Sequence, residues 1–221
     1  MTRLPVIALD GPAGSGKSTI AKLVAAKLGL NYIDTGAMYR TVTLKALRTK
    51  TSTKDEKALT SLAKSTKIDF VYGEKLKVFM DGVEVTDEIR LPEVSKASSD
   101  IADSVGVRTE LVSKQQEMGK SGGVIMDGRD IGSLVFPDAE VKIYLDASVS
   151  ERAERRFKEL NGKGVKSNLE TVKKDIIARD ERDKTRPFGA LKKVADSITV
   201  DTTGMTIPEV VENIIKIIKK H

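Results

Sequence analysis

Residues 11–18 read Gly11-Pro12-Ala13-Gly14-Ser15-Gly16-Lys17-Ser18. They fill every fixed position of the phosphate-binding loop pattern G-x-x-x-x-G-K-[ST]. A short apolar run, Val6 to Leu9, precedes them, and four apolar residues at helical spacing follow, namely Ile20, Leu23, Val24 and Leu28. A strand, a glycine-rich turn and a helix N-terminus are the context in which backbone N–H groups converge on phosphate oxygens. The sequence therefore predicts a phosphate-binding loop in an α/β fold.

Each residue type in this loop has a physical reason. Gly11, Gly14 and Gly16 permit positive φ and a close approach of the backbone to a ligand. Lys17 offers a charge to the β and γ phosphates, and Ser18 offers a hydroxyl to Mg²⁺. A glycine-rich turn without a ligand is the alternative, but it does not explain a Lys-Ser pair at the start of a helix. We therefore expect a nucleoside triphosphate and Mg²⁺.

The composition is that of an ordinary globular chain. Its 221 residues suit one α/β domain, and 39% of them are apolar and 32% charged. The sequence contains no apolar run of membrane-spanning length and no secretory leader pattern, so we expect a cytoplasmic protein with no membrane partner. The absence of cysteine and the single histidine, His221, exclude disulfides, thiol nucleophiles, structural zinc and histidine acid/base chemistry.

The net charge of +6 has two explanations, a nucleic acid partner or a small anionic substrate. Aromatic residues make up only 4% of the chain, too few to suggest platforms on which bases would stack. We therefore expect small anionic molecules as partners and no nucleic acid. We separately expect a monomer.

Strand-like and helical segments alternate along most of the chain. Strand-like runs lie at 31–33, 124–126, 141–146 and 197–201. Helical segments lie at 17–28, 38–47, within 51–65, at 105–118, 150–160 and 169–182, and after a capping box formed by Thr206 and Glu209. Residues 34–37 are expected to form a turn. This alternation predicts a three-layer fold with a central parallel sheet.

The pattern changes between residues 67 and 100. Alternating runs at 68–72, 76–80 and 83–85 are joined by Gly73-Glu74 and by Asp81-Gly82, the latter a strong type I′ hairpin signal. A helical stretch at 92–101 follows. We expect an inserted antiparallel subdomain at about 67–100, a helical lid hairpin at about 150–186, and a core of residues 1–66, 101–149 and 187–221.

Two polar residues at strand and helix ends are candidates for the site. Asp127 ends the apolar run 124–126, as a Walker B acid that holds Mg²⁺ would, although an aspartate at a strand end also caps turns. Arg40 lies at the start of the helix that follows a polar strand end, where its guanidinium and the helix dipole both favour an anion. Taken alone, Arg40 would more often be a surface residue.

The second arm of the lid hairpin carries Arg179, Asp183 and Arg186 at positions i, i+4 and i+7. They share one face if the helix extends that far. Such a face is often a solvated salt-bridge ladder, and its alternative is a lid that folds over bound phosphates.

The chain lacks the Asn-Lys-x-Asp guanine reader of GTPases, which leaves a small phosphotransferase. Its dispersed arginines suit a second anionic substrate, because guanidinium groups neutralise the repulsion between two sets of phosphates. Lys17 and the lid arginines, with Arg152 and Arg156 as further candidates, would neutralise charge on the migrating phosphoryl group.

At this point the sequence resembles the bacterial cytidylate kinase family. The resemblance rests on residues 8–19, 34–40, 126–132, 136–139, 142–147 and 179–186. It implies a P-loop kinase fold in which the insertion binds the nucleoside monophosphate. It also implies ATP-dependent phosphorylation of CMP and dCMP to CDP and dCDP with Mg²⁺, with ATP bound by residues 11–18 and Thr19. Ser18 and Asp127 are then the expected metal-holding residues.

The resemblance also assigns the substrate site, which comprises Thr35, Arg40, Ser99, Arg108, Arg129, Asp130, Arg179, Asp183 and Arg186. It implies that Arg40, Arg129 and Arg179 bind the acceptor phosphate, and that Lys17, Arg129 and Arg179 are catalytic. Asp183 and Arg186 would contact the sugar and its surroundings. Ser99, Arg108 and Asp130 would contact the cytosine. Thr35 stands where many relatives carry serine and keeps the hydroxyl.

The hydrogen-bonding groups of cytosine fit the side chains of Ser99, Arg108 and Asp130. Cytosine presents a donor at its exocyclic amine and an acceptor at N3, and uracil presents the opposite at both atoms. A carboxylate and a hydroxyl that accept from the amine, with an arginine that donates to N3, would pair with cytosine and not with uracil. A kinase for another acceptor, such as UMP or shikimate, and a nucleotide-binding module without transfer are the alternatives, with nucleic acid binding third.

Overall fold

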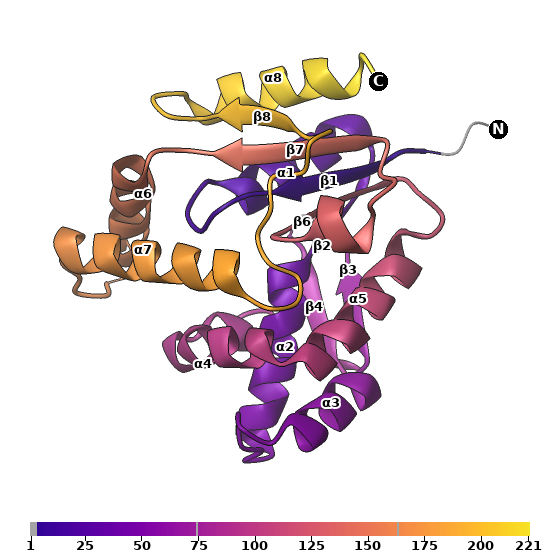
Figure 1. Ribbon diagram of the computed structural model, residues 1–221, viewed down its shortest axis with the longest axis vertical. Coiled ribbons are helices and arrows are strands. Elements are labelled where there is room, and N and C mark those ends of the chain that lie inside the picture. The colour runs from indigo at the N-terminus through magenta and orange to yellow at the C-terminus, as the bar shows by residue number, and fades with distance from the viewer. Residues whose placement is uncertain (1–3, 74, 163) are drawn as a thin grey trace. The chain divides into compact units, whose positions relative to one another are not determined.

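The computed structural model describes residues 4–73, 75–162 and 164–221 (Figure 1). They form two compact units: the described residues up to Tyr32 and from Gly122 onward, and Ile33–Ser121. The expected division into core, insertion and lid stays a prediction. The predicted turn at 73–74 and the hairpin tip at 162–164 include residues 74 and 163, which lie outside the described residues.

A five-stranded sheet in the order β2-β6-β1-β7-β8 organises the first unit. The strands are β1 (Val6–Asp10), β2 (Asn31–Asp34), β6 (Val124–Gly128), β7 (Val141–Asp146) and β8 (Ile198–Asp201). Strand β1 pairs in parallel with β6 and β7, and β7 pairs in parallel with β8. All residues of β1 and β6 are buried, as expected of central strands in a parallel sheet covered on both faces. The predicted parallel sheet is confirmed.

The helices of this unit are α1 (Lys17–Leu28), α6 (Val149–Gly162), α7 (Leu169–Thr185) and α8 (Ile207–Ile218), with a π-helical turn, η2 (Ile131–Val135). Helix α8 begins at the predicted capping box and packs on α1. The predicted apolar face of α1 is wrong at Leu23, which is 41% exposed. The buried apolar face consists of the predicted Ile20 and Val24 together with Ala21 and Ala25. The small alanine side chains let α1 pack closely on the sheet.

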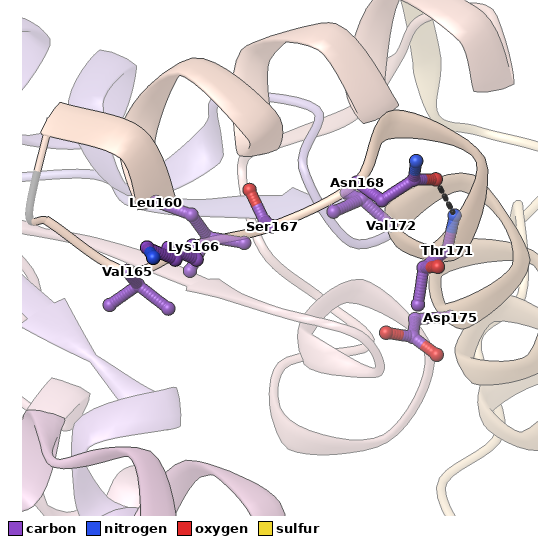
Figure 2. Close-up of a pocket in the computed structure, with 8 residues that line it drawn as sticks. All are labelled: Leu160, Val165, Lys166, Ser167, Asn168, Thr171, Val172 and Asp175. Carbon is purple, nitrogen blue, oxygen red and sulfur yellow. Dashed lines mark hydrogen bonds between the residues drawn. The ribbon is translucent and has the colours of Figure 1, made fainter.

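Helices α6 and α7 form the predicted hairpin (Figure 1). Its own apolar cluster consists of Ala153, Val172 and Ile176, with Val149, Phe157 and Leu160 packed against it. Near its turn lies a shallow open hollow, shown in Figure 2, lined by Leu160, Val165, Lys166, Ser167, Asn168, Thr171, Val172 and Asp175. Asn168 caps α7 there by accepting a hydrogen bond from the Thr171 N–H at 3.2 Å.

The second unit combines four helices with a small antiparallel sheet. The helices are α2 (Thr35–Arg48), α3 (Glu56–Ser65), α4 (Pro92–Asp103) and α5 (Val105–Gly119), with a 3₁₀ turn, η1 (Glu88–Arg90). The sheet is β3 (Ile68–Val71), β4 (Lys77–Met80) and β5 (Val83–Glu84), in that order. Asp81 and Gly82 have φ of 52° and 85°, so both central residues of the turn are left-handed, as type I′ requires. The predicted meander is confirmed.

The predicted turn at residues 34–37 is wrong, since α2 begins at Thr35. Asp34 is its N-cap and accepts a hydrogen bond from the Ala37 N–H at 2.7 Å. This cap satisfies an N–H group that the first turn of a helix otherwise leaves unpaired, so the helix starts directly after β2 despite Gly36.

The described residues contain no helix that combines the length and the apolar character needed to cross a bilayer.

Gly106 allows α5 to pack closely on α3. A Cβ atom at this position would lie 1.9 Å from the Thr60 Oγ1 atom. We expect Gly106→Ala to lower the free energy of unfolding by about 2 kcal/mol, because the overpacked contact must push the helices apart. Urea unfolding would measure the loss. Gly162→Ala is the control, since its Cβ would meet nothing within 4 Å. Equal stability of the two variants would contradict this account of the packing.

Candidate active site

The phosphate-binding loop joins β1 to α1, as the sequence predicts. Gly16 is the N-cap of α1 with φ of 91°, a conformation that a residue with a Cβ rarely adopts. Gly11 faces the backbone of β7, and a Cβ there would lie 2.1 Å from the Leu145 carbonyl oxygen. The N-terminus of α1 therefore follows an open turn of backbone, the arrangement that binds phosphates.

Lys17 is buried, with 5% of its surface exposed, and its side chain folds back over the loop. Its Nζ donates to the Pro12 carbonyl at 2.7 Å and to the Ser15 Oγ at 3.2 Å. Burial lowers the pKa of Lys17 well below its ordinary value and Arg129 adds to this, while Asp127 and Asp10 oppose it. A phosphate group placed here would add to the negative charge that Asp127 and Asp10 bring to the buried ammonium.

Ser18 and Asp127, the two expected metal-holding residues, lie together. The Ser18 hydroxyl donates to Oδ2 of Asp127 at 2.8 Å, and the Tyr32 hydroxyl donates to Oδ1 at 2.7 Å. A hydroxyl beside a carboxylate is the hard oxygen donor set that suits Mg²⁺. Tyr32 was not among the candidates, because a single aromatic residue in a short strand gives no sign of its partner.

Asp183 joins two of the expected substrate-binding arginines. It accepts from Nε of Arg129 at 2.7 Å and from Nη2 of Arg186 at 2.9 Å. Burial acts to raise the pKa of Asp183, but Arg129, Arg179 and Arg186 outweigh it and hold the pKa below its usual value. The helix ends at Thr185, and Arg186 is its C-cap. Asp183 and Arg186 are buried whereas Arg179 is exposed, so only part of the predicted face is in contact with solvent.

Asp10, at the end of β1, orders the segment that carries Arg129 and Asp130. Its carboxylate accepts from the N–H groups of Ile131 at 2.9 Å and Gly132 at 2.7 Å. Burial raises the pKa of Asp10 to about 6; the two N–H groups lower it, Asp130 raises it, and Lys17 lowers it. Asp10 was not among the site residues predicted from the sequence, although it directly precedes the loop.

The two further arginine candidates on α6 are placed differently from each other. Arg152 is buried and bonds to the Ala13 and Ala147 carbonyls and to Asp180. Arg156 lies at the surface and pairs with Glu159 at 2.7 Å. The guanidinium of Arg152 thus contacts the backbone of the phosphate-binding loop. Asp180 was also absent from the candidates.

The second unit holds the remaining expected residues. Nη2 of Arg40 donates to Oδ2 of Asp34 at 3.2 Å, while Nε of Arg40 is buried with no hydrogen-bond partner among the described residues. Gly36 leaves room for this guanidinium, since a Cβ there would lie 3.0 Å from Nη1. A buried donor without a partner is uncommon and points to a missing acceptor.

Arg108, on α5, is only 2% exposed. Its guanidinium lies over the Tyr39 ring at 5.2 Å and donates to the Ala102 carbonyl at 3.1 Å. Thr35 is buried in the first turn of α2, and Ser99 is half-buried on α4.

A phosphate-binding loop after the first strand of a parallel sheet, with an acid at the end of the neighbouring strand, defines a P-loop nucleotide-binding protein. The family model described as cytidylate kinase matches residues 7–220. Cytidylate kinases from Pediococcus pentosaceus and Desulforamulus reducens are each 51% identical to the chain. The alignments cover 96% and 100% of this chain, and 95% and 99% of those proteins. The chain belongs to the cytidylate kinase family.

Among solved structures, the chain is similar to an uncharacterized protein from Eubacterium ventriosum ATCC 27560. The TM-score is 0.57 at 13% identity, with 100% of both chains covered. This likeness concerns the fold alone.

The raised pKa of Asp10 predicts a pH dependence of stability. Between pH 4 and pH 6 the unfolded chain loses the Asp10 proton while the folded chain keeps it, so this group destabilises the fold as the pH rises. The stability of the wild type relative to Asp10→Asn should fall by about 2 kcal/mol between pH 4 and pH 7.

Urea titrations of both proteins across this pH range would measure the difference. Asp201→Asn is the control of opposite sign, because hydrogen bonds from Thr203 lower the pKa of Asp201. A difference for Asp10→Asn that stays constant with pH would contradict the raised pKa.

Proposed function

We propose that this protein transfers the γ-phosphoryl group of ATP to CMP and dCMP and releases CDP and dCDP. The observation that carries the proposal is 51% identity to cytidylate kinases over nearly the full length of both chains. The buried Lys17 in its phosphate-binding loop and the Ser18–Asp127 pair support it chemically.

On the donor side, residues 11–19 would hold the ATP phosphates, with the N–H groups that follow Ala13 as the backbone donors. Lys17 would exchange its contacts with Pro12 and Ser15 for phosphate oxygens, which compensate an ammonium better than a carbonyl and a hydroxyl do. Ser18 and Asp127 would hold Mg²⁺, which neutralises phosphate charge when bound. The described residues contain no cluster of three or more metal-ligating acids, histidines or cysteines, so phosphate oxygens would complete this coordination.

On the acceptor side, Arg40, Arg129 and Arg179 would bind the α-phosphate. The unpartnered Nε of Arg40 supports this role. Nε of Arg129 pairs with Asp183 and Nη1 donates to the Gly128 carbonyl at 3.2 Å, so Nη2 is the group that would bind an anion. The CMP phosphate is largely dianionic near pH 7, so its oxygen can attack in line without a general base. Lys17, Arg129 and Arg179 would stabilise the transition-state charge.

The remaining assignments follow the family. Asp183 and Arg186 would contact the sugar and its surroundings, Ser99, Arg108 and Asp130 the cytosine, and Thr35 the nucleotide through its hydroxyl. The insertion at about 67–100 would bind the monophosphate and the hairpin at about 150–186 would act as the lid. We also propose that the protein acts as a monomer in the cytoplasm.

A coupled assay of ADP release across CMP, dCMP, UMP, AMP and shikimate tests the substrate class. Activity confined to CMP and dCMP is expected. Preference for UMP or shikimate would move the protein to another kinase specificity, and ATP binding without ADP release would leave only a nucleotide-binding module.

Lys17→Ala separates the donor site from the acceptor site. We expect turnover to fall by at least about 100-fold, because the charge that stabilises the transferred phosphoryl group is lost. Affinity for CMP, measured by calorimetry, should stay within about twofold. Lys27→Ala, on the exposed last turn of α1, is the matched control. Loss of CMP binding in Lys17→Ala would show that one group serves both sites.

Asp130→Asn tests whether Asp130 recognises the cytosine base. The amide can donate where the carboxylate only accepts, so the ratio of kcat/KM for CMP over UMP should narrow by about tenfold. Asp138→Asn changes an exposed carboxylate nearby in sequence and should leave the ratio unaltered. The same ratio in the wild type and Asp130→Asn would remove Asp130 from the cytosine site.

A further inference from the structure

Two buried side chains of the α6–α7 hairpin form hydrogen bonds with the backbone of the phosphate-binding loop at Ala13. Oδ1 of Asp180, on α7, accepts a hydrogen bond from the Ala13 N–H at 3.1 Å. Nη1 of Arg152, on α6, donates to the Ala13 carbonyl at 3.0 Å. The same Nη1 donates to Oδ2 of Asp180 at 2.5 Å. Both backbone polar groups of Ala13 are thus bound by one ion pair.

The loop is also seated on α6 by direct packing. A Cβ atom on Gly14 would lie 3.2 Å from both the Cβ and the carbonyl oxygen of Arg152. Nε of Arg152 is fixed in turn by the Ala147 carbonyl at 2.9 Å. These contacts restrict the rotation of the Arg152 side chain. They also fix the orientation of the peptide groups on either side of Ala13.

The ion pair is not the only contact between the two helices. They already share the apolar cluster of Ala153, Val172 and Ile176. Both charged groups are buried, with side chains 5% and 8% exposed. A buried ion pair is weak evidence for stability, because apolar residues of similar size often replace one without loss. Its hydrogen bonds with the Ala13 backbone indicate that this pair does more than hold α6 and α7 together.

We propose that Asp180 and Arg152 are positioning residues for the ATP-binding loop. They fix the peptide groups at Ala13, and thereby hold the following N–H groups in the geometry that binds the phosphates. The inference rests on the proposed function in that the loop binds ATP. Asp180 directly follows Arg179, so the turn of α7 that would present an arginine to the acceptor phosphate is tied to the donor loop.

Calorimetric titration of the full-length chain with MgATP, and separately with CMP, tests this role. In the double variant Arg152→Met with Asp180→Leu, the pair is replaced by apolar side chains of similar size, so the fold should persist. We expect the Kd for MgATP to rise by about tenfold, because small displacements of binding groups are costly, while the Kd for CMP stays within about twofold. Thermal unfolding of each variant monitors the fold.

Two single variants complete the set. Asp180→Asn keeps an oxygen for the Ala13 N–H and should weaken MgATP binding less than the double variant, by about threefold. Arg155→Met removes a charge from the same helix whose partners are Glu151 and Thr202, and should leave MgATP binding unchanged.

The outcomes separate the possible explanations. A folded double variant with wild-type affinity for MgATP overturns the inference, as does an equal loss of affinity for MgATP and CMP, which indicates a structural role only. If the double variant does not fold, Asp180→Asn decides, and wild-type MgATP affinity in that variant overturns the inference. Failure of the wild type itself to bind MgATP refutes the proposed function, and the positioning role with it.

Discussion

The buried ammonium group of Lys17 is the constraint on which the first unit depends. A charge that leaves water must be compensated by hydrogen bonds and by charges of opposite sign. The Pro12 carbonyl and the Ser15 hydroxyl supply the hydrogen bonds, and the carboxylates of Asp10 and Asp127 the charge. Asp10 ends β1 and Asp127 lies one residue before the end of the neighbouring β6, so both acids lie at the carboxyl edge of the parallel sheet, where the loop begins.

The acids around this centre also hold the backbone. Asp10 binds the N–H groups that follow Arg129 and Asp130, and Asp180 binds the N–H of Ala13. Asp183 orients Arg129 and Arg186 without neutralising both of them. Each of these three acids therefore holds a backbone N–H group or a guanidinium group in place. Such an arrangement suits a site for polyanions, because the binding groups are ordered before a ligand arrives.

The parts of the fold that local patterns encode could be predicted from the sequence. The loop, the parallel sheet, the meander with its Asp81-Gly82 turn and the capping box at Thr206 each depend on residues close together in the chain. Two local predictions were wrong. Leu23 matches the helical period but its side chain is exposed. Residues 34–37 were expected to form a turn, but Asp34 is the N-cap of a helix that begins at Thr35. The pairing of Ser18 with Asp127 could be expected because both residues belong to known motifs.

Tyr32, Asp10, Asp180 and the loop contacts of Arg152 could not be predicted. Tyr32 meets Asp127 at a separation of 95 residues, and Ala13 meets Asp180 at 167. No spacing rule links residues so far apart, and an aspartate on an amphipathic helix looks like a solvated charge in the sequence. Only the three-dimensional arrangement shows that these side chains are buried and what they bind.

The central position of β1 has a consequence for how the protein is made. This strand lies between β6 and β7, whose residues are more than a hundred positions later in the chain. A ribosome releases residues 6–18 long before either neighbour exists, and contacts between distant segments form slowly. The nucleotide-binding motif is therefore translated before both strands that flank β1, and its strand can be paired on both sides only after they have been made.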